Sequence, residues 1–388
     1  MLYIDMSHDR QRFQDPVVPE ALAEYLQTAP QYKGKELLYF YHPEVPTVIV
    51  GHYQDVYHEV NFPYLREKQI GLVRRNSGGG AVFIDPGDLT YVYIDTAPKV
   101  KTPKFNLYIS PILLALKELG INAEQTGRND LTVDGKKFSG MSFSQIKDRV
   151  LYGGTLMLNV NLEEANRVLT PSKSKLEDKG IESVRSRVTN LKDYINIPSF
   201  TTNDLRDLIL KYVKKENKDF KTTKLSEQEW ADIIELGHRK FGTKEWIYGS
   251  NLAHYYVDSY FHGIGSIGIA FNVKEHRLAD VKIYGDLMVI SQKVAEQLQE
   301  ELDGCPIVQD EIKQILIKYD LDGSIKSGTA SQLATEIINE AANENTTKKS
   351  AGNGTFLLYC IIIYKIWHIL NNFFVTSKNR QKKWSVVI

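Results

Sequence analysis

The sequence predicts an α+β fold, because strand-like runs and separate helices alternate through its first half. The strand candidates are short, rich in β-branched and aromatic residues, and bounded by turn residues. They cover residues 37–41, 47–51, 71–75, 80–84, 89–94 and 154–160. Two helices interrupt them, at residues 16–26 and 108–120, and Gly120 ends the second. Hairpin signals beside separate helices favour α+β over a doubly wound parallel sheet.

Three further elements follow from local signals. Residues 131–138 form a hairpin, since Asp134-Gly135 supplies the positive φ angles of a type I′ turn. Residues 202–215 have the spacing of an amphipathic helix. Ser226 and Glu229 make a capping box that begins a helix over residues 227–241.

The pattern divides the chain into three parts. Residues 1–248 form a first domain and residues 250–340 a small second one, with a strand pair over 262–273 and 278–285 followed by a helix over 289–302. Residues 341–388 form an atypical tail, in which a polar linker precedes a ten-residue apolar run and a basic segment. Ten residues are too few to span a ~30 Å hydrocarbon core. A membrane-surface anchor, a packed terminal helix and an extension unrelated to the fold all stay open.

Composition excludes several classes of function. The 388 residues carry 48 basic and 48 acidic side chains, so no net field draws the chain to nucleic acid or to an anionic membrane. Two cysteines, Cys305 and Cys360, make a disulfide framework implausible and favour a reducing cytoplasm. The N-terminus lacks a signal-peptide pattern, and the nine histidines show no metal-ligand spacing. We therefore expect a cytoplasmic protein without structural zinc, and a monomer by default.

A glycine-rich segment, RRNSGGGAVF from Arg74, is the most informative part of the sequence. Three consecutive glycines cost backbone entropy, so a close approach of backbone N–H groups to a phosphate or carboxylate is a candidate reason for them. Arg75 could pair with the same anion in a bidentate manner. A glycine-rich bend in a sheet is the alternative. A P-loop and a Rossmann turn are excluded, because the segment leads into a strand rather than a helix.

A second segment, GRNDLTVDGKKFSG from Gly127, brings Asn129 and Asp130 near two lysines. Lys136 and Lys137 are neighbours on a strand, so their side chains point to opposite faces. One of them could enter a site, where a ligand phosphate would balance its charge. Two ordinary surface lysines beside a turn are the alternative.

Five motifs in one order resemble the lipoate-protein ligase family over residues 1 to about 340. They are RRNSGGGAV, GRNDL, DGKKFSG, GGTLMLNV and KGIESVRSRVTNL. The resemblance implies a catalytic domain with the fold of biotin ligases, followed by a small accessory domain. It also implies an ATP- and Mg²⁺-dependent enzyme that activates lipoate as lipoyl-AMP. The lipoyl group would pass to a lysine of a lipoyl-domain acceptor, either glycine-cleavage H protein or the E2 subunit of a 2-oxoacid dehydrogenase.

The resemblance also assigns site residues. Lys137 would be the catalytic residue, between the lipoate carboxylate and the α-phosphate. Asn129 and Asp130 would lie on the nucleotide side, with Asp130 as the Mg²⁺ ligand. The residues that wrap the adenylate would be Arg75, Ser77, Gly78, Gly79, Gly80, Ala81, Val82, Phe83 and Ser142. Val82 and Phe83 would line an apolar slot for the acyl chain, and the loop over residues 183–190 would pack near the adenylate.

The chain departs from the family pattern at several positions. Ile84 replaces a histidine, Tyr152 and Gly153 stand where histidine is often found, and Asp88 replaces an asparagine.

Four other functions compete with this interpretation. An octanoyl- or lipoyl-transferase of the same fold uses a cysteine thioester, but the first 304 residues contain no cysteine. A biotin ligase would carry GRGRRG where SGGG stands. A protein that only binds an acyl ligand would not need a cation at the phosphate. A membrane-tethered adaptor rests on the apolar tail alone.

Overall fold

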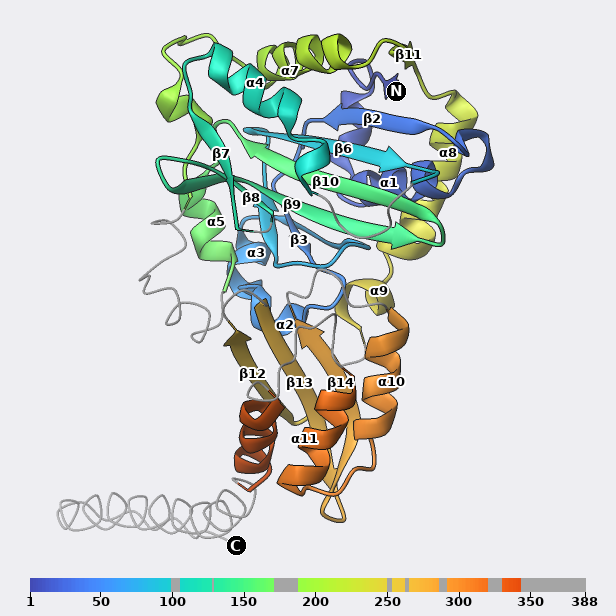
Figure 1. Cartoon of the computed structure of the whole chain (residues 1–388), viewed down its shortest axis with the longest axis vertical. Helices are drawn as coiled ribbons and strands as arrows, with labels where there is room; N and C mark the ends of the chain where they lie inside the picture. Colours follow the sequence, from blue (N-terminus) through green and yellow to red (C-terminus); the bar gives the residue numbers. More distant parts are fainter. Residues whose placement is uncertain are drawn as a thin grey trace, which may run out of the picture.

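The computed structural model describes residues 1–98, 105–127, 129–170, 188–249, 253–261, 265–285, 292–319 and 330–342. Its largest element is an eight-stranded mixed sheet (Figure 1). The strands are, in spatial order, β11 (Lys221–Thr223), β1 (Leu2–Ile4), β2 (Glu36–Tyr41), β6 (Asp88–Asp95), β10 (Arg149–Met157), β9 (Lys136–Ile146), β8 (Asp130–Val133) and β7 (Ala123–Thr126).

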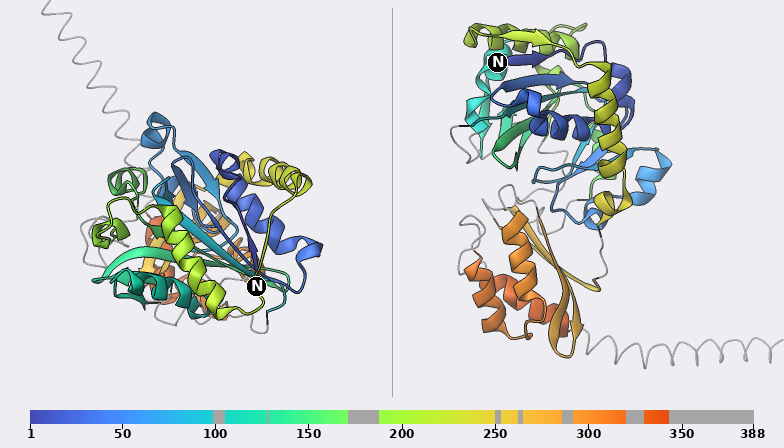
Figure 2. Two further views of the ribbon diagram at one scale, coloured as in Figure 1. Left: turned by 90° about the horizontal axis from the view of Figure 1, so that it is seen from above. Right: turned by 90° about the vertical axis from the view of Figure 1, so that its right-hand side faces the viewer.

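Helices cover both faces of this sheet (Figure 2). On one face lie α4 (Ser110–Glu118) and α7 (Thr202–Glu216), and on the other α1 (Val18–Thr28) and α8 (Glu227–Leu236). The alternation of side chains along β6 builds both cores. Tyr91 and Tyr93 pack towards α4 and α7, whereas Val92 and Ile94 pack towards α1 and α8. The sheet is therefore buried on both faces, which explains its nearly continuous apolar strands.

A small second sheet stands beside the large one. It consists of β4 (Gly71–Arg74), β3 (Thr47–Val50) and β5 (Val82–Ile84), packed against α2 (Val56–Glu59), α3 (Phe62–Glu67) and α5 (Leu162–Val168). The glycine-rich segment, residues 75–81, connects β4 to β5 and is called the glycine loop below. Because β5 leads directly into β6, the loop is tied to the large sheet.

Short elements complete this part of the chain. They are the 3₁₀ turns η1 (Arg10–Gln14), η2 (Pro30–Tyr32), η3 (Phe105–Leu107) and η5 (Leu191–Tyr194), the π-turn η6 (Gly237–Phe241) and α9 (Lys244–Tyr248).

The C-terminal unit has a core of its own. An antiparallel sheet of β12 (Tyr255–Phe261), β13 (Gly265–Lys274) and β14 (Arg277–Gly285) packs against α10 (Gln292–Leu302), α11 (Gln309–Lys318) and a helix over 330–342. Tyr53 from the first unit joins it, since its carbonyl accepts a hydrogen bond from the Gly285 N–H at 2.7 Å. The His58 ring also stacks on Tyr256, 4.0 Å between centroids.

Most predicted elements are present. The Asp134-Gly135 turn has the expected positive φ values of 49° and 72°, Gly120 ends α4 with φ 80°, and the Ser226–Glu229 capping box is formed. The strand pair and helix predicted after residue 250 correspond to β13, β14 and α10 over the described residues.

Several boundaries differ from the predictions. β5 begins at Val82 because residues 80–81 belong to the glycine loop, and the helix predicted to Phe241 widens into the π-turn from Gly237. β10 begins at Arg149 and ends at Met157, since the next two N–H groups bond to the Gly87 carbonyl. β1, β7 and β11 were not predicted from the sequence. They have only three or four residues each, too few for a periodic signal.

The predicted tail lies outside the described residues from 343 onwards. Among the helices that the structure describes, none is long and apolar enough to cross a bilayer. The division at 248–250 stays a prediction, although the core clusters on its two sides share no residue.

Candidate functional site

The buried guanidinium of Arg75 holds the glycine loop in place. It donates to the carbonyls of Gly78 at 2.7 Å and Gly80 at 2.9 Å, and to Ser77 Oγ at 2.9 Å. A longer bond, 3.2 Å, reaches the Ile49 carbonyl in β3. Sequence analysis assigned Arg75 to a bound anion, and that contact stays a prediction. In this structure the side chain braces the loop from inside.

Two glycines allow the loop to pack closely on β3. Gly79 has φ 91°, in the region that favours glycine. Its carbonyl lies against Gly51, where an added Cβ would stand 2.0 Å from the Gly79 oxygen. A side chain at position 51 would therefore displace the loop.

Lys137 and Asp130 form an ion pair at the start of β9 and β8. Lys137 Nζ lies 2.7 Å from Asp130 Oδ1, and the two side chains are 30% and 26% exposed. The lysine reaches its partner by crossing Gly140, the cross-strand neighbour of Asp130. A Cβ at Gly140 would stand 2.7 Å from Nζ. Lys136 is exposed, in agreement with the prediction that these two neighbouring strand residues point to opposite faces.

Asn129 and Ser142 are held close to this pair. The Asn129 amide donates to the Met141 carbonyl at 2.6 Å, and the Met141 N–H donates to the Asn129 carbonyl at 2.8 Å. Ser142 is the cross-strand partner of Gly153 in β10, and its hydroxyl donates to the Gly153 carbonyl at 3.4 Å. Gly140, Ser142 and Gly153 thus leave this part of the sheet with little side-chain bulk.

Val82 and Phe83, both predicted to line the acyl slot, pack on opposite sides of β5. They are consecutive residues of β5, so their side chains point to opposite faces. Phe83 is buried with Val48 and Val50 in the small sheet's own core. Val82 is partly buried and packs on the side of Val17, which precedes α1. The assignment of both residues to the acyl slot stays a prediction, and strand alternation points their two side chains to opposite faces of β5.

The glycine loop is connected through β5 to the end of the large sheet at which Lys137 stands. β6 begins one residue after Gly87, and its first residue, Asp88, pairs with the last residue of β10, Met157. β10 and β9 are also antiparallel, so the end of β10 lies beside the start of β9, where Lys137 stands.

Two carboxyl groups, the buried Asp88 and the partly buried Glu20, were not predicted as site residues. Asp88 is fully buried, and neither carboxyl oxygen has a hydrogen bond of normal geometry among the described residues. Burial first, and the charge of Asp85 second, raise its pKa to about 8. Burial also raises the pKa of Glu20, in α1, to about 7, although the charge of Arg75 opposes the shift. The replacement of asparagine by Asp88 was the only sequence signal, and Glu20 left none.

The predicted metal and loop residues have the following surroundings. No cluster of three or more His, Cys, Asp or Glu side chains fit for a metal occurs among the described residues. Asp130 can thus offer a single carboxylate. Of the loop predicted to pack near the adenylate, residues 183–187 lie outside the described residues. Val188 bridges to Lys137, and the Thr189 N–H donates to the Lys137 carbonyl at 2.9 Å.

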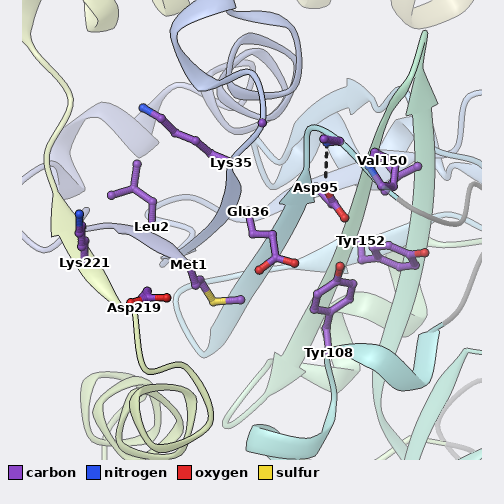
Figure 3. A pocket seen from close by; sticks show the side chains of 13 residues that line it. Met1, Leu2, Lys35, Glu36, Asp95, Tyr108, Val150, Tyr152, Asp219 and Lys221 are labelled. Carbon is purple, nitrogen blue, oxygen red and sulfur yellow. Dashed lines mark hydrogen bonds between the residues drawn. The ribbon is translucent and has the colours of Figure 1, made fainter.

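A cavity of about 880 Å³ opens at the opposite end of the large sheet (Figure 3). Its lining includes Glu36, Asp95 and Val150, which are cross-strand neighbours, and Tyr108 and Tyr152. Asp95 is seven residues along β6 from Asp88, or about 23 Å at the usual rise of a strand. None of the predicted site residues lines this cavity.

Comparisons with known families cover both units of the chain. Residues 15–214 match the lipoyl protein ligase A/B catalytic domain, and residues 252–337 match the bacterial lipoate protein ligase C-terminus. Lipoate-protein ligase 1 of Staphylococcus aureus is 34% identical over 308 residues, which are 79% of this chain and 92% of the relative. A lipoate-protein ligase of Streptococcus pyogenes is 32% identical and covers 87% of this chain and 100% of its own length.

Solved structures agree with this match. A Plasmodium falciparum protein, LipL1, superposes with a TM-score of 0.66 at 21% identity, over 87% of this chain and 99% of that one, and shows the shared fold. An archaeal bipartite lipoate protein ligase from Thermoplasma acidophilum, described with its E2 lipoyl domain, gives 0.52 at 26% identity, over 64% and 95%. A lipoate-protein ligase A bound with ATP gives 0.52 at 25%, over 61% and 94%. The chain therefore belongs to the lipoate-protein ligase family and is a lipoate-protein ligase.

Proposed function

We propose that the glycine loop and the Lys137 cluster form the site where ATP and lipoate react to lipoyl-AMP, from which the lipoyl group passes to an acceptor lysine. The observation that carries this proposal is the half-buried Lys137 ammonium laid across Gly140. The ATP-bound relative supports ATP as the co-substrate.

Adenylation brings two anions together. A carboxylate oxygen of lipoate attacks the α-phosphorus of ATP, and pyrophosphate leaves. A fixed ammonium and backbone N–H donors offset the repulsion between the reactants and the charge that develops in the transition state. Lys137 supplies the ammonium, and the glycine loop, braced by Arg75, supplies ordered backbone. No covalent enzyme intermediate is required.

Mg²⁺ fits the site through Asp130. Mg²⁺ is usually held by one or two carboxylates together with substrate phosphates, so a single half-exposed carboxylate is sufficient. The ion would neutralise the leaving pyrophosphate. Asp130 pairs with Lys137 in this structure, so a bound Mg²⁺ would share this carboxylate with the ammonium.

The acyl chain needs a slot beside Lys137. The face of β9 and β10 that carries Gly140, Ser142 and Gly153 has little side-chain bulk, and a Cβ at Gly153 would meet its nearest neighbours at an ordinary contact distance of 3.6 Å. We place the chain there, with Val82 as the β5 residue able to contribute to the opposite wall.

In the second half-reaction, the acceptor amine attacks the mixed anhydride and AMP leaves. The enzyme contributes orientation, and water must be kept from the anhydride. Lipoyl domains are the acceptor class, and we propose an E2 lipoyl domain on the strength of the archaeal relative. We also propose a cytoplasmic location, which the scarcity of cysteine supports. The proposed oligomeric state is a monomer.

A carrier-protein acyltransferase has no support among the described residues. Their one cysteine, Cys305, is buried in the C-terminal core, where burial raises the pKa of its thiol. A thiol in that setting is a poor nucleophile.

The test is lipoate-dependent exchange of labelled pyrophosphate into ATP by the full chain, followed by lipoylation of an isolated E2 lipoyl domain. Lys137→Ala should lower the exchange rate at least about a hundredfold, the loss typical of a missing transition-state cation. Lys136→Ala is the matched control and should leave it unchanged. Exchange without Lys137, or none by the wild type with lipoate or octanoate, would refute the proposed function.

A further inference from the structure

A cluster of three polar side chains, which includes Asn76, clamps the start of the glycine loop. Asn76, which precedes Ser77, donates through Nδ2 to Glu24 Oε2 at 2.6 Å. Its Oδ1 accepts from Lys240 Nζ at 3.0 Å, and Lys240 also donates to Glu24 at 2.5 Å. The three residues come from α1, the loop and the π-turn η6, and every pair among them is hydrogen-bonded.

The π-turn places Lys240 at the loop. Its i to i+5 bond, from the Gly242 N–H to the Gly237 carbonyl at 2.9 Å, widens the end of α8. Gly237 lies so close to α1 that a Cβ there would meet Val17 Cγ2 at 3.0 Å. This contact brings Lys240 next to Glu24. A π-turn is an unusual element and often marks a functional position.

Aromatic rings enclose the ammonium. Lys240 Nζ lies 4.2 Å from the Trp246 ring centroid and 5.0 Å from that of Phe241, at distances favourable for cation–π attraction. The Trp246 indole N–H donates to the Arg74 carbonyl at 2.8 Å. Residues 74 and 76, which flank Arg75, are therefore both held by the segment 240–246.

We propose that Lys240, Glu24 and Asn76 are positioning residues for adenylation, acting through the glycine loop. Arg75 donates hydrogen bonds to the carbonyls of Gly78 and Gly80, whereas Lys240 and Glu24 hold the Asn76 side chain in place. The inference rests on the proposed function of the loop as the adenylate site and deepens it. Lys240 contacts no reacting atom in this assignment, so its effect must pass through Asn76.

The clamp differs from ordinary surface ion pairs of this chain. Lys211 and Glu118 make a comparable pair, at 2.6 Å, beside Tyr212, but it joins α7 to α4 on the face of the sheet away from α1. Its side chains are 46% and 38% exposed, against 27% and 17% for Lys240 and Glu24. Lys211→Met therefore serves as a matched control that removes an ion pair without touching the loop.

The experiment measures kcat and KM for lipoate and ATP in pyrophosphate exchange with the full chain. Lys240→Met and Asn76→Ala should each raise KM about tenfold, and the double variant should be no worse than the poorer single one, because both break the same path. Lys240→Arg should restore most of the affinity. Asn76→Ala leaves the Lys240–Glu24 pair intact, so it stays informative if Lys240→Met folds poorly.

Three results would overturn the inference while wild-type exchange persists: unchanged KM in both single variants, effects that multiply in the double variant, or an equal KM change in Lys211→Met. Loss of exchange by the wild type would instead remove the proposed function itself.

Discussion

The Lys137 side chain passes over Gly140, which has no side chain, to pair with Asp130. The ammonium crosses Gly140 to meet the carboxylate at 2.7 Å, and both groups remain partly accessible. A cation held in this way is positioned before the substrate arrives, which lowers the reorganisation that adenylation requires. Because of this contact, we expect a side chain at position 140 to reduce activity without reducing the stability of the fold.

Gly140→Ala should lower adenylation strongly while changing stability little. The added Cβ would collide with Nζ, the movable end of a long side chain, so the fold can adapt but the ammonium is displaced. We expect a loss of kcat/KM of about a hundredfold, measured by pyrophosphate exchange, with an unfolding midpoint near that of wild type. Gly242→Ala is the control, because its Cβ would meet only ordinary contacts at 3.5 Å. Full activity in Gly140→Ala would contradict the assigned path of Lys137.

Asp130→Asn should raise the Mg²⁺ concentration needed for half-maximal exchange about tenfold, since an amide is a weaker ligand for a hard cation than a carboxylate. A Mg²⁺ titration of the exchange rate measures this. Asp134→Asn is the control, because Asp134 is exposed in the turn and asparagine tolerates its positive φ. An unchanged Mg²⁺ requirement would leave Asp130 as a partner of Lys137 alone.

Arg75→Lys should destabilise the fold as well as reduce activity. The guanidinium bonds four oxygens in a buried setting, and an ammonium cannot reach them in the same geometry. We expect a loss of about 3 kcal/mol in the free energy of unfolding, measured with urea. Arg167→Lys, at an exposed ion pair, should have little effect. A variant with wild-type stability and reduced ATP binding would make Arg75 a ligand rather than a brace.

Asp88→Asn should stabilise the protein in a pH-dependent way. The pKa of Asp88 is raised to about 8 in the fold from an ordinary value near 3.8, so the folded state keeps a proton that the unfolded state loses. The stability contributed by this group therefore falls as pH rises from about 4 to about 8. The variant should gain on the order of 5 kcal/mol over wild type at pH 8 and nothing near pH 4. Urea unfolding of both proteins across this range measures the difference; a gain independent of pH would be inconsistent with a buried neutral acid.

The sequence by itself determined the elements with strong local signals. The Asp134-Gly135 turn, the Ser226–Glu229 capping box and the end of α4 at Gly120 each depend on residues within a few positions. The same holds for the placement of Lys136 and Lys137 on opposite sides of one strand. The co-occurrence of five motifs in one order was sufficient to indicate the family by resemblance, whereas any one of them alone would have meant little.

The tertiary structure decided which side chains meet. Arg75 turns inward to the loop carbonyls, Phe83 faces the core of the small sheet, and Lys240 reaches Asn76 from 164 residues away. Such contacts depend on sheet order and on the packing of α1 against the π-turn, neither of which leaves a periodic trace in sequence. Tertiary structure also raises the pKa values of Asp88 and Glu20, because distant segments of the chain remove water from around both carboxyl groups.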